Sequence, residues 1–433
     1  MRSGQFLLQP LVAAMAIAYS TTTLAVETPT HALTAIVATA QTGNDANGLI
    51  VRADPKQPIQ PIPATDGADY LQSIVGFSAV NSGAGTNGDV TFRGMFGSRI
   101  KILTDGTENL GACPSRMDSP TSYISPESYD QISVIKGPQT VQYANTGSAA
   151  TVIFERRPED FSQDQNYRGQ ASVVVGSYGR LDQNIEAAVG DEQKYIRLNT
   201  NRSVSDSYQD GDGKTVPSDW ERWNADIALG WTPNEDTWVE LTGGKADGEA
   251  VYAGRAMDGS KFARESLGLR VEKKNISDVI KKIEAQVNYN FNDHVMDNYS
   301  LRKPPMMQMA TNVARKTLNA RLAMTQEWDN IDLITGIDTQ NNEHSIRKTD
   351  AMQGIAYQDQ PRMTDMKFQS FGGFGELTYH FDDENRLVSG VRIDQVEVKD
   401  QRNVTASLDK QREHTLFSGF VRFENTHPDH DDG

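Results

Sequence analysis

From residue 168 onward the chain alternates apolar and polar residues over long segments, and this pattern constrains the fold more than any other feature. Twelve segments carry the alternation, many of them 9–16 residues long. Strands of soluble proteins are most often about 5–6 residues long, whereas a tilted strand that crosses a membrane needs about 9–11 residues. The predicted strands span residues 171–176, 181–190, 195–201, 222–231, 237–246, 265–273, 279–301, 314–328, 331–346, 367–381, 386–399 and 412–424.

The connections between these segments alternate in length. The short ones are residues 191–193, 232–236, 274–278, 329–330 and 382–385, and the long ones are residues 202–221, 247–264, 302–313, 347–366 and 400–411. A β-barrel of the outer membrane has short turns on one rim and longer loops on the other. The sequence therefore predicts a transmembrane antiparallel β-barrel. The alternative, a soluble β-sandwich, does not explain why short and long connections alternate.

Composition excludes several other classes of protein. The net charge of −16 argues against nucleic-acid binding, because few cations are free to neutralise a phosphate backbone. The single cysteine, Cys113, rules out an intrachain disulfide framework and a CxxC zinc site. After the N-terminus no run of 18 apolar residues occurs, so no membrane-spanning helix is expected. No nucleophile–base pair or phosphate-binding loop is evident, and we expect no enzymatic activity.

The first 63 residues read as a leader and a linker. Residues 1–25 have a basic Arg2, an apolar stretch and small residues before Ala25, which is typical of a cleaved signal peptide. Residues 26–63 are rich in Thr, Ala and Pro, a composition that suits an extended segment. Within it, residues 33–40 are β-prone and suited to adding a strand to a partner's sheet.

Residues 64–160 have the pattern of a compact mixed domain that precedes the barrel of residues 161–433. A short helix is expected over residues 69–75, and short strands over residues 89–94, 99–106 and 131–138. Asp105 and Gly106 are expected to form a turn.

Three motifs of this domain resemble the plug domain of TonB-dependent outer-membrane receptors. They are Phe92-Arg93-Gly94, Ile102-Leu103-Thr104-Asp105-Gly106 and Ile132-Ser133-Val134-Ile135-Lys136-Gly137-Pro138-Gln139. The resemblance implies an N-terminal α+β plug inside a barrel of 22 strands, of which about 12 are present, so that the chain resembles a C-terminally truncated receptor. It also implies a monomer among the lipids of the outer membrane of a Gram-negative bacterium. The partner would be TonB with its inner-membrane energising complex, bound by Leu33, Thr34, Ala35, Ile36 and Val37.

Within that family the chain looks most like the copper receptors, whose mark is C-x-x-x-M in a plug loop and H-x-M on the barrel. Here these motifs are Cys113 with Met117, and His294 with Met296. The resemblance implies that copper is the transported ligand and that these four residues hold it between plug and barrel. Thiolate and thioether ligands select Cu(I), and imidazole accepts either copper state. Residues at i and i+2 of a strand share a face, so His294 and Met296 are expected to point together.

Further assignments remain open at this stage. We expect Cys113 in an exposed plug loop, His294 near the outer end of a strand, and Met257 as a possible auxiliary ligand. A lone cysteine is ordinarily a small buried apolar residue. A ferric-siderophore receptor is one alternative, for which Tyr252, Arg255 and Arg264 are available. A truncated receptor fragment without transport activity is another.

Overall fold

A computed structural model describes residues 49–57, 63–80, 88–143, 148–402 and 410–425. All of them belong to one compact unit. The predicted signal peptide and the predicted TonB-binding residues 33–37 lie outside the described residues, as does most of the linker. Their assignments therefore stay predictions.

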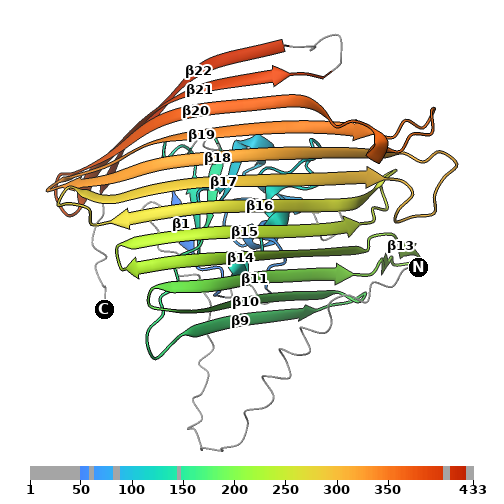
Figure 1. Ribbon diagram of the computed structural model, residues 1–433, viewed down its shortest axis with the longest axis horizontal. Helices are drawn as coiled ribbons and strands as arrows, with labels where there is room; N and C mark the ends of the chain where they lie inside the picture. Colours follow the sequence, from blue (N-terminus) through green and yellow to red (C-terminus); the bar gives the residue numbers. More distant parts are fainter. Residues whose placement is uncertain (1–48, 58–62, 81–87, 144–147, 403–409, 426–433) are drawn as a thin grey trace, which may run out of the picture. The chain divides into compact units, whose positions relative to one another are not determined.

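The C-terminal two thirds of the chain form a single sheet of twelve strands, in which every strand pairs antiparallel with its neighbours (Figure 1). The strands are β9 (Tyr167–Val175), β10 (Leu181–Asp191), β11 (Lys194–Ser205), β14 (Trp220–Asn234), β15 (Thr237–Ala250), β16 (Asp258–Lys274), β17 (Ile280–Asp297), β18 (Ala310–Trp328), β19 (Ile331–Lys348), β20 (Met363–His380), β21 (Asn385–Asp400) and β22 (Lys410–Asn425). Strands adjacent in this list are adjacent in space, with β9 and β22 at the two ends of the order. The prediction of twelve antiparallel strands is confirmed.

The largest error in strand boundaries concerns β16. The sequence predicts a loop up to residue 264, but β16 begins at Asp258. A register shift between Gly259 and Lys261 interrupts the ladder with β17 at this point. A bulge inserts an extra residue and breaks the period of two, so the alternation that marks a strand is lost. In the long loop after β11, a small hairpin of β12 (Tyr208–Gln209) and β13 (Thr215–Val216) also went unpredicted.

The two faces of the sheet differ in chemistry. On β21, Arg392 and Asp394 are buried on one face, while Val391 and Ile393 are exposed on the other. We call the first face, which contacts the N-terminal domain, the inner face, and the second the outer face. Large apolar side chains exposed along the outer face of the other strands include Val173, Ile196, Leu198, Leu229, Leu267, Val287, Leu318, Leu322, Ile337 and Phe371. Apolar outside and polar inside is the arrangement of a membrane barrel.

Aromatic residues near strand ends are only partly the interface residues that their positions predict. Trp231, Trp328 and Phe381 are exposed, as residues of an interfacial belt should be. Trp238 is buried on the inner face, where its Nε1 donates to the Tyr195 hydroxyl at 2.9 Å. Strand position alone does not say which face a residue occupies, and Trp238 belongs to the interior and not to the belt.

The N-terminal domain is a mixed structure with its own apolar core. Its main sheet has the order β1 (Ile50–Ala53), β7 (Gln131–Lys136), β8 (Ala150–Glu155), β5 (Ile100–Thr104) and β6 (Thr107–Glu108), with β5 and β8 parallel. A second sheet contains β2 (Phe77–Val80), β3 (Asp89–Phe92) and β4 (Met95–Phe96), next to the helix α2 (Gly67–Leu71). The short helices η1 (Gly97–Arg99), η2 (Pro120–Tyr123) and η3 (Pro126–Ser128) lie in this domain, and η4 (Tyr357–Asp359) lies in the loop before β20. None of the helices in the described ranges is long and apolar enough to cross a membrane.

Local sequence explains several of these elements. Asp105 and Gly106 both have positive φ, 49° and 79°, as a two-residue type I′ turn between β5 and β6 requires. The predicted turn is therefore confirmed. The predicted helix is shorter than expected and begins earlier, because the Asp66 side chain caps it by accepting hydrogen bonds from the amides of Ala68 and Asp69.

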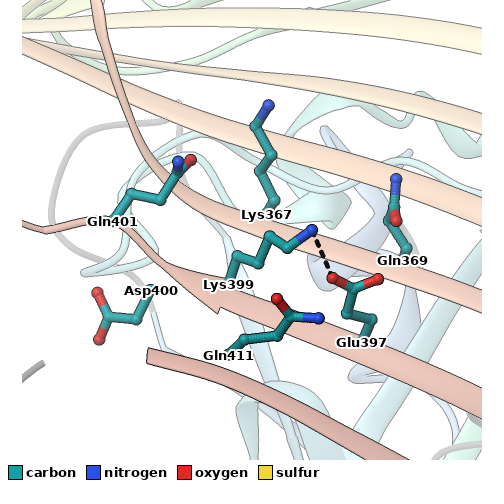
Figure 2. A pocket seen from close by; sticks show the side chains of 7 residues that line it. All are labelled: Lys367, Gln369, Glu397, Lys399, Asp400, Gln401 and Gln411. Carbon is teal, nitrogen blue, oxygen red and sulfur yellow. Dashed lines mark ion pairs between the residues drawn. The ribbon is translucent and has the colours of Figure 1, made fainter. Parts of the chain in front are cut away.

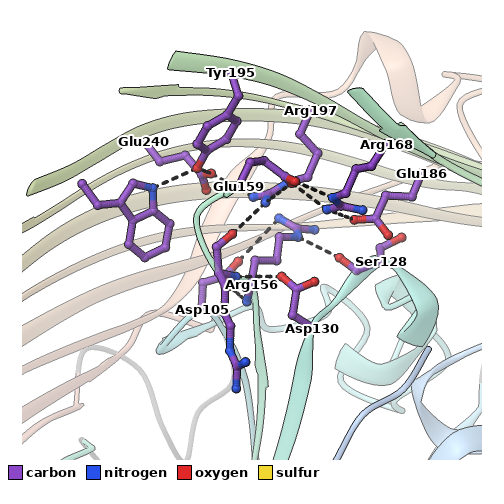
Figure 3. A network of polar contacts seen from close by, with 12 residues as sticks. Asp105, Ser128, Asp130, Arg156, Glu159, Arg168, Glu186, Tyr195, Arg197 and Glu240 are labelled. Carbon is purple, nitrogen blue, oxygen red and sulfur yellow. Dashed lines mark hydrogen bonds and ion pairs between the residues drawn. The ribbon is translucent and has the colours of Figure 1, made fainter. Parts of the chain in front are cut away.

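A buried network of charges joins the N-terminal domain to the inner face (Figure 3). Arg197 on β11 donates to Glu159, in the connection that follows β8, at 3.0 Å and to Glu240 on β15 at 2.8 Å. All three side chains are at most 5% exposed. Lys56 continues the network by bridging Asp130 and Glu186. Because these charges are removed from water, each depends on its partners.

This network generates a stability prediction. Replacing Arg197 by Leu leaves Glu240 as a buried carboxylate without its cation and removes one of the two arginines that bind Glu159, which should lower the free energy of unfolding by about 3–5 kcal/mol. Thermal denaturation in detergent measures the change. Arg202→Leu is the matched control, because the Arg202–Glu221 pair is exposed and should contribute only about 0–1 kcal/mol. Equal losses in the two variants would contradict the prediction.

Candidate metal-binding site

The loop that carries Cys113 and Met117 reverses direction in a tight turn. The amide of Arg116 donates to the carbonyl of Cys113 at 2.9 Å, and Pro114 stands at the second position of this turn, where its fixed φ is favourable. Arg116 has a φ of 56°, in the left-handed region. The reversal brings the chain back after Cys113, and the side chains of Cys113 and Met117 both pack in one apolar cluster.

Asp118 closes the same loop. Its carboxylate accepts hydrogen bonds from the amides of Ala112 at 2.6 Å and Cys113 at 2.7 Å. Gly111 lies so close to the backbone of Asp118 that an added Cβ would fall 1.7 Å from its carbonyl oxygen. The loop is therefore a closed unit that has no room for a side chain at position 111.

The other half of the site is formed by β16 and β17. Phe262 is paired with His294, and Gly259 with Met296, across the bulge between the two strands. A Cβ at Gly259 would collide with the Phe262 ring at 2.3 Å. The bulge and the missing side chain thus make room for this ring, which tilts against the His294 imidazole with 4.7 Å between the ring centres.

The two halves meet in one apolar cluster. Met117 and Phe262 are buried in it with Ala250 and Tyr252, and Cys113, Met296 and Trp220 pack against it. Because His294 stacks on Phe262, all four residues of the two predicted motifs lie in this cluster or against one of its members. Cys113 is half-buried here rather than exposed, because the loop packs against the wall of the sheet.

His294 is the most unusual side chain of the site. It is 1% exposed, and neither ring nitrogen has a hydrogen-bond partner. The backbone of Lys261 interacts with the ring electrostatically but falls short of hydrogen-bond geometry. A buried polar group without a partner is costly, so two orphaned imidazole nitrogens beside three sulfur-bearing side chains are suited to binding a soft metal ion.

Met257 and the other polar groups of the described residues give less support for a metal site than the two motifs do. Met257 is half-buried in the loop before β16 and is not among the residues packed in the cluster. Within the described ranges, no three His, Cys, Asp or Glu side chains are arranged to hold a metal. A cavity of about 480 Å³ near the ends of β20, β21 and β22 is lined by polar side chains, with Lys399 paired to Glu397 (Figure 2). It contains no residue of the two motifs.

Contacts that the motifs do not reveal hold the loop against the sheet. The Asn292 side chain on β17 donates to the carbonyl of Leu110, and at 3.0 Å to Asn109. His344 on β19 donates from Nε2 to the carbonyl of Ala112 at 2.9 Å, while its Nδ1 bonds Asp365 at 2.5 Å. Asn292 and His344 lie 182 to 232 positions from their partners in the loop, and no local pattern marks them.

The thiol of Cys113 is poorly set up to ionise in the absence of a ligand. Burial raises its pKa, and the charge of Asp118 raises it further, while hydrogen bonds from the backbone of Met117 and Ser115 act in the opposite direction. At neutral pH the free site therefore contains a thiol, which must lose its proton when a metal binds.

Cys113 allows the loop to be tested, because it is the chain's single cysteine. Replacing Asp118 by Ala removes the acceptor that closes the loop and a negative charge near the sulfur, so maleimide labelling of Cys113 should become several-fold faster. Asp350→Ala, in a loop after β19, is the control and should leave the rate unchanged. An unaltered rate in the Asp118 variant would show that the carboxylate does not fix the loop.

Comparisons with known proteins agree with this architecture. Residues 51–151 match the TonB-dependent receptor plug domain, and residues 199–428 match the TonB-dependent receptor-like β-barrel. No curated protein matches the sequence. The solved structure titled copper transporter OprC is 50% identical, with a TM-score of 0.84 over 90% of this chain and 61% of that one.

More distant structures share the fold. The FrpB iron transporter from Neisseria meningitidis (F5-1 variant) is 15% identical, with a TM-score of 0.66 over 85% of this chain and 60% of its own. FpvA of P. aeruginosa is 12% identical, with a TM-score of 0.68 over 90% of this chain and 56% of its own. The present chain thus spans about three fifths of the length of these proteins. The chain belongs to the TonB-dependent receptors, a family of outer-membrane transporters that are not enzymes.

Proposed function

We propose that the receptor takes up copper across the outer membrane, with the ion held by Cys113, Met117, His294 and Met296. The observation that carries this proposal is the buried imidazole of His294, whose two nitrogens have no partner and which stacks on Phe262. The Phe262 ring belongs to the cluster that contains the side chains of Cys113, Met117 and Met296. The similarity to a protein titled copper transporter supports the choice of metal.

The donor set suits copper better than a harder metal. Three sulfur donors and one imidazole select Cu(I) over harder cations. The nearby carboxylate of Asp118 already accepts hydrogen bonds from the amides of Ala112 and Cys113. The structural zinc sites of proteins use four Cys or His ligands. Copper is thus the substrate whose chemistry matches the four donors.

The site is divided between two parts of the protein that can move apart. Cys113 and Met117 belong to the plug, and His294 and Met296 belong to the barrel strand β17. We infer that TonB, bound to residues 33–37, pulls the plug and separates the two pairs of ligands. An ion that loses half of its ligands binds more weakly, and it would be released towards the periplasm.

A siderophore receptor is less well supported. It needs Tyr252, Arg264 and Arg255 to face an open binding site. Tyr252 is 3% exposed, and Arg264 is paired with Asp226 at 2.9 Å. Arg255 stacks over the Tyr252 ring at 5.3 Å. With two of the three residues already buried or paired, we retain copper as the proposed substrate.

Removing single ligands tests the proposal. Cys113→Ser, Met117→Leu, His294→Phe and Met296→Leu each delete one donor with little change in volume, and copper in the purified, copper-loaded protein should fall well below one ion per chain. Elemental analysis by mass spectrometry gives the stoichiometry. Met324→Leu on β18, whose sulfur accepts a hydrogen bond from Gln326, is the control and should retain copper. Full copper content in the Cys113 and His294 variants would remove the assignment.

The coupling segment has a separate test. Deleting residues 33–40 should leave copper binding intact but abolish uptake into cells, because that segment is proposed to bind TonB and not the metal. Radioactive copper uptake and stoichiometry are measured on the same variants. Loss of binding as well would contradict the proposed role of the segment. Binding without uptake even in the undeleted chain would favour the alternative of a copper-binding fragment without transport.

A further inference from the structure

Arg315 on the inner face of β18 lacks the carboxylate partner that comparable arginines have. Arg197, Arg264 and Arg392 on the same face each donate to a carboxylate at 2.6–3.0 Å. Within the described ranges Arg315 has no such ion pair. Its Nη1 donates a long hydrogen bond of 3.3 Å to the side chain of Asn342, and its Nε is buried without a partner.

The guanidinium lines a cavity between the plug and the sheet. The cavity has a volume of about 330 Å³, near the lower end of the roughly 300–1,000 Å³ of small-molecule sites. Ile100 and Ile102 from the plug and Phe368 and Val396 from the sheet supply apolar walls. The cavity therefore combines an apolar body with one cationic corner.

The other charged groups of the cavity are already matched. Lys101 is paired with Glu108 at 2.7 Å, and Arg116 is paired with Asp89 at 2.5 Å. Asp118, Glu108 and Asp365 act on Arg315 through space, but none of them is in contact with it. The charge of Arg315 is thus the one that an entering ligand can neutralise.

We propose that this cavity is a binding site for a small organic carboxylate. The planar fork of a guanidinium matches a carboxylate with two parallel hydrogen bonds, and the side-chain amide of Asn342 can supply a further donor. The apolar body of the ligand packs between Ile102 and Phe368. Arg315 is half-buried, and its charge has no carboxylate of the described residues in contact, so a bound anion would stabilise this part of the plug–barrel interface.

The site would also touch the proposed copper loop. Leu110 and Arg116 line the cavity, and they flank Cys113 on either side in the sequence. The anion has two possible sources, a free carboxylate or the carboxylate of a copper chelator. The recognition chemistry is the same for both.

Calorimetric titration of the purified full chain in detergent tests the site, with benzoate as the probe and benzamide as its uncharged equivalent. Benzoate should bind saturably, and benzamide should bind at least about tenfold more weakly, because hydrogen bonds to a charged group are lost. Arg315→Gln should weaken benzoate binding by a similar factor. Arg202→Gln, which alters an exposed pair on β11, is the control and should bind like the wild type.

The comparison with benzamide on the wild-type chain keeps the test decisive if the Arg315 variant does not fold. The proposal is overturned if benzoate does not bind, if benzamide binds equally well, or if Arg315→Gln binds benzoate like the wild type. Benzoate binding to Cys113→Ser at the wild-type affinity would support an anion site whatever the outcome for copper. The failure of one proposal is therefore distinguishable from that of the other.

A second titration separates the two sources. Picolinate, a carboxylate that chelates copper, is added with and without the metal. Tighter binding of the copper complex than of picolinate alone supports the site with a chelate as its ligand. Equal binding of the two, lost in Arg315→Gln, supports the site with a free anion as its ligand.

Discussion

The polar contact between the plug and the inner face of the sheet is the interaction on which the remaining structure depends. A sulfur-bearing loop can share an ion with a barrel strand only if the plug is held at a fixed height against that strand. Arg197 binds Glu159 at one place, and His344 binds the carbonyl of Ala112 at another. The first contact is buried and ionic, whereas the second is a hydrogen bond directly beside Cys113.

The two kinds of contact differ in what they contribute: the first stabilises the plug, and the second limits the movement of the loop. The pairs made by Arg197 are almost fully removed from water, so their loss is costly. The loop that carries Cys113 and Met117 is held against the sheet by hydrogen bonds to backbone and amide groups, chiefly those of Asn292 and His344. A pull on the plug that breaks the weaker set would move Cys113 and Met117 first, which is the order that release of a shared ion requires.

The strand pattern could be predicted from the sequence because strand chemistry is local. Alternation along each strand reports the two faces of the sheet, and Asp105-Gly106 reports a type I′ turn. The start of β16 could not be predicted, because the bulge at Gly259 breaks the period of two. The burial of Trp238 could not be predicted, because its partner Tyr195 lies 43 residues away.

The candidate site, like the fold, could be predicted only where short segments of sequence carry the signal. Both motifs were identified through the resemblance to the copper receptors, and their spacing adds only that two residues apart in a strand share a face. Phe262, which stacks on His294 and belongs to the cluster of the other three residues, lies in a segment that the sequence marks as a loop. The unpaired nitrogens of His294 and the anchoring role of His344 depend on contacts across the fold, which no local pattern records.

X-ray absorption at the copper edge of the loaded receptor tests the central claim most directly, because it reports the atoms bound to the metal. The account predicts a first shell dominated by sulfur with a single imidazole nitrogen. A first shell of nitrogen and oxygen atoms without sulfur would contradict it.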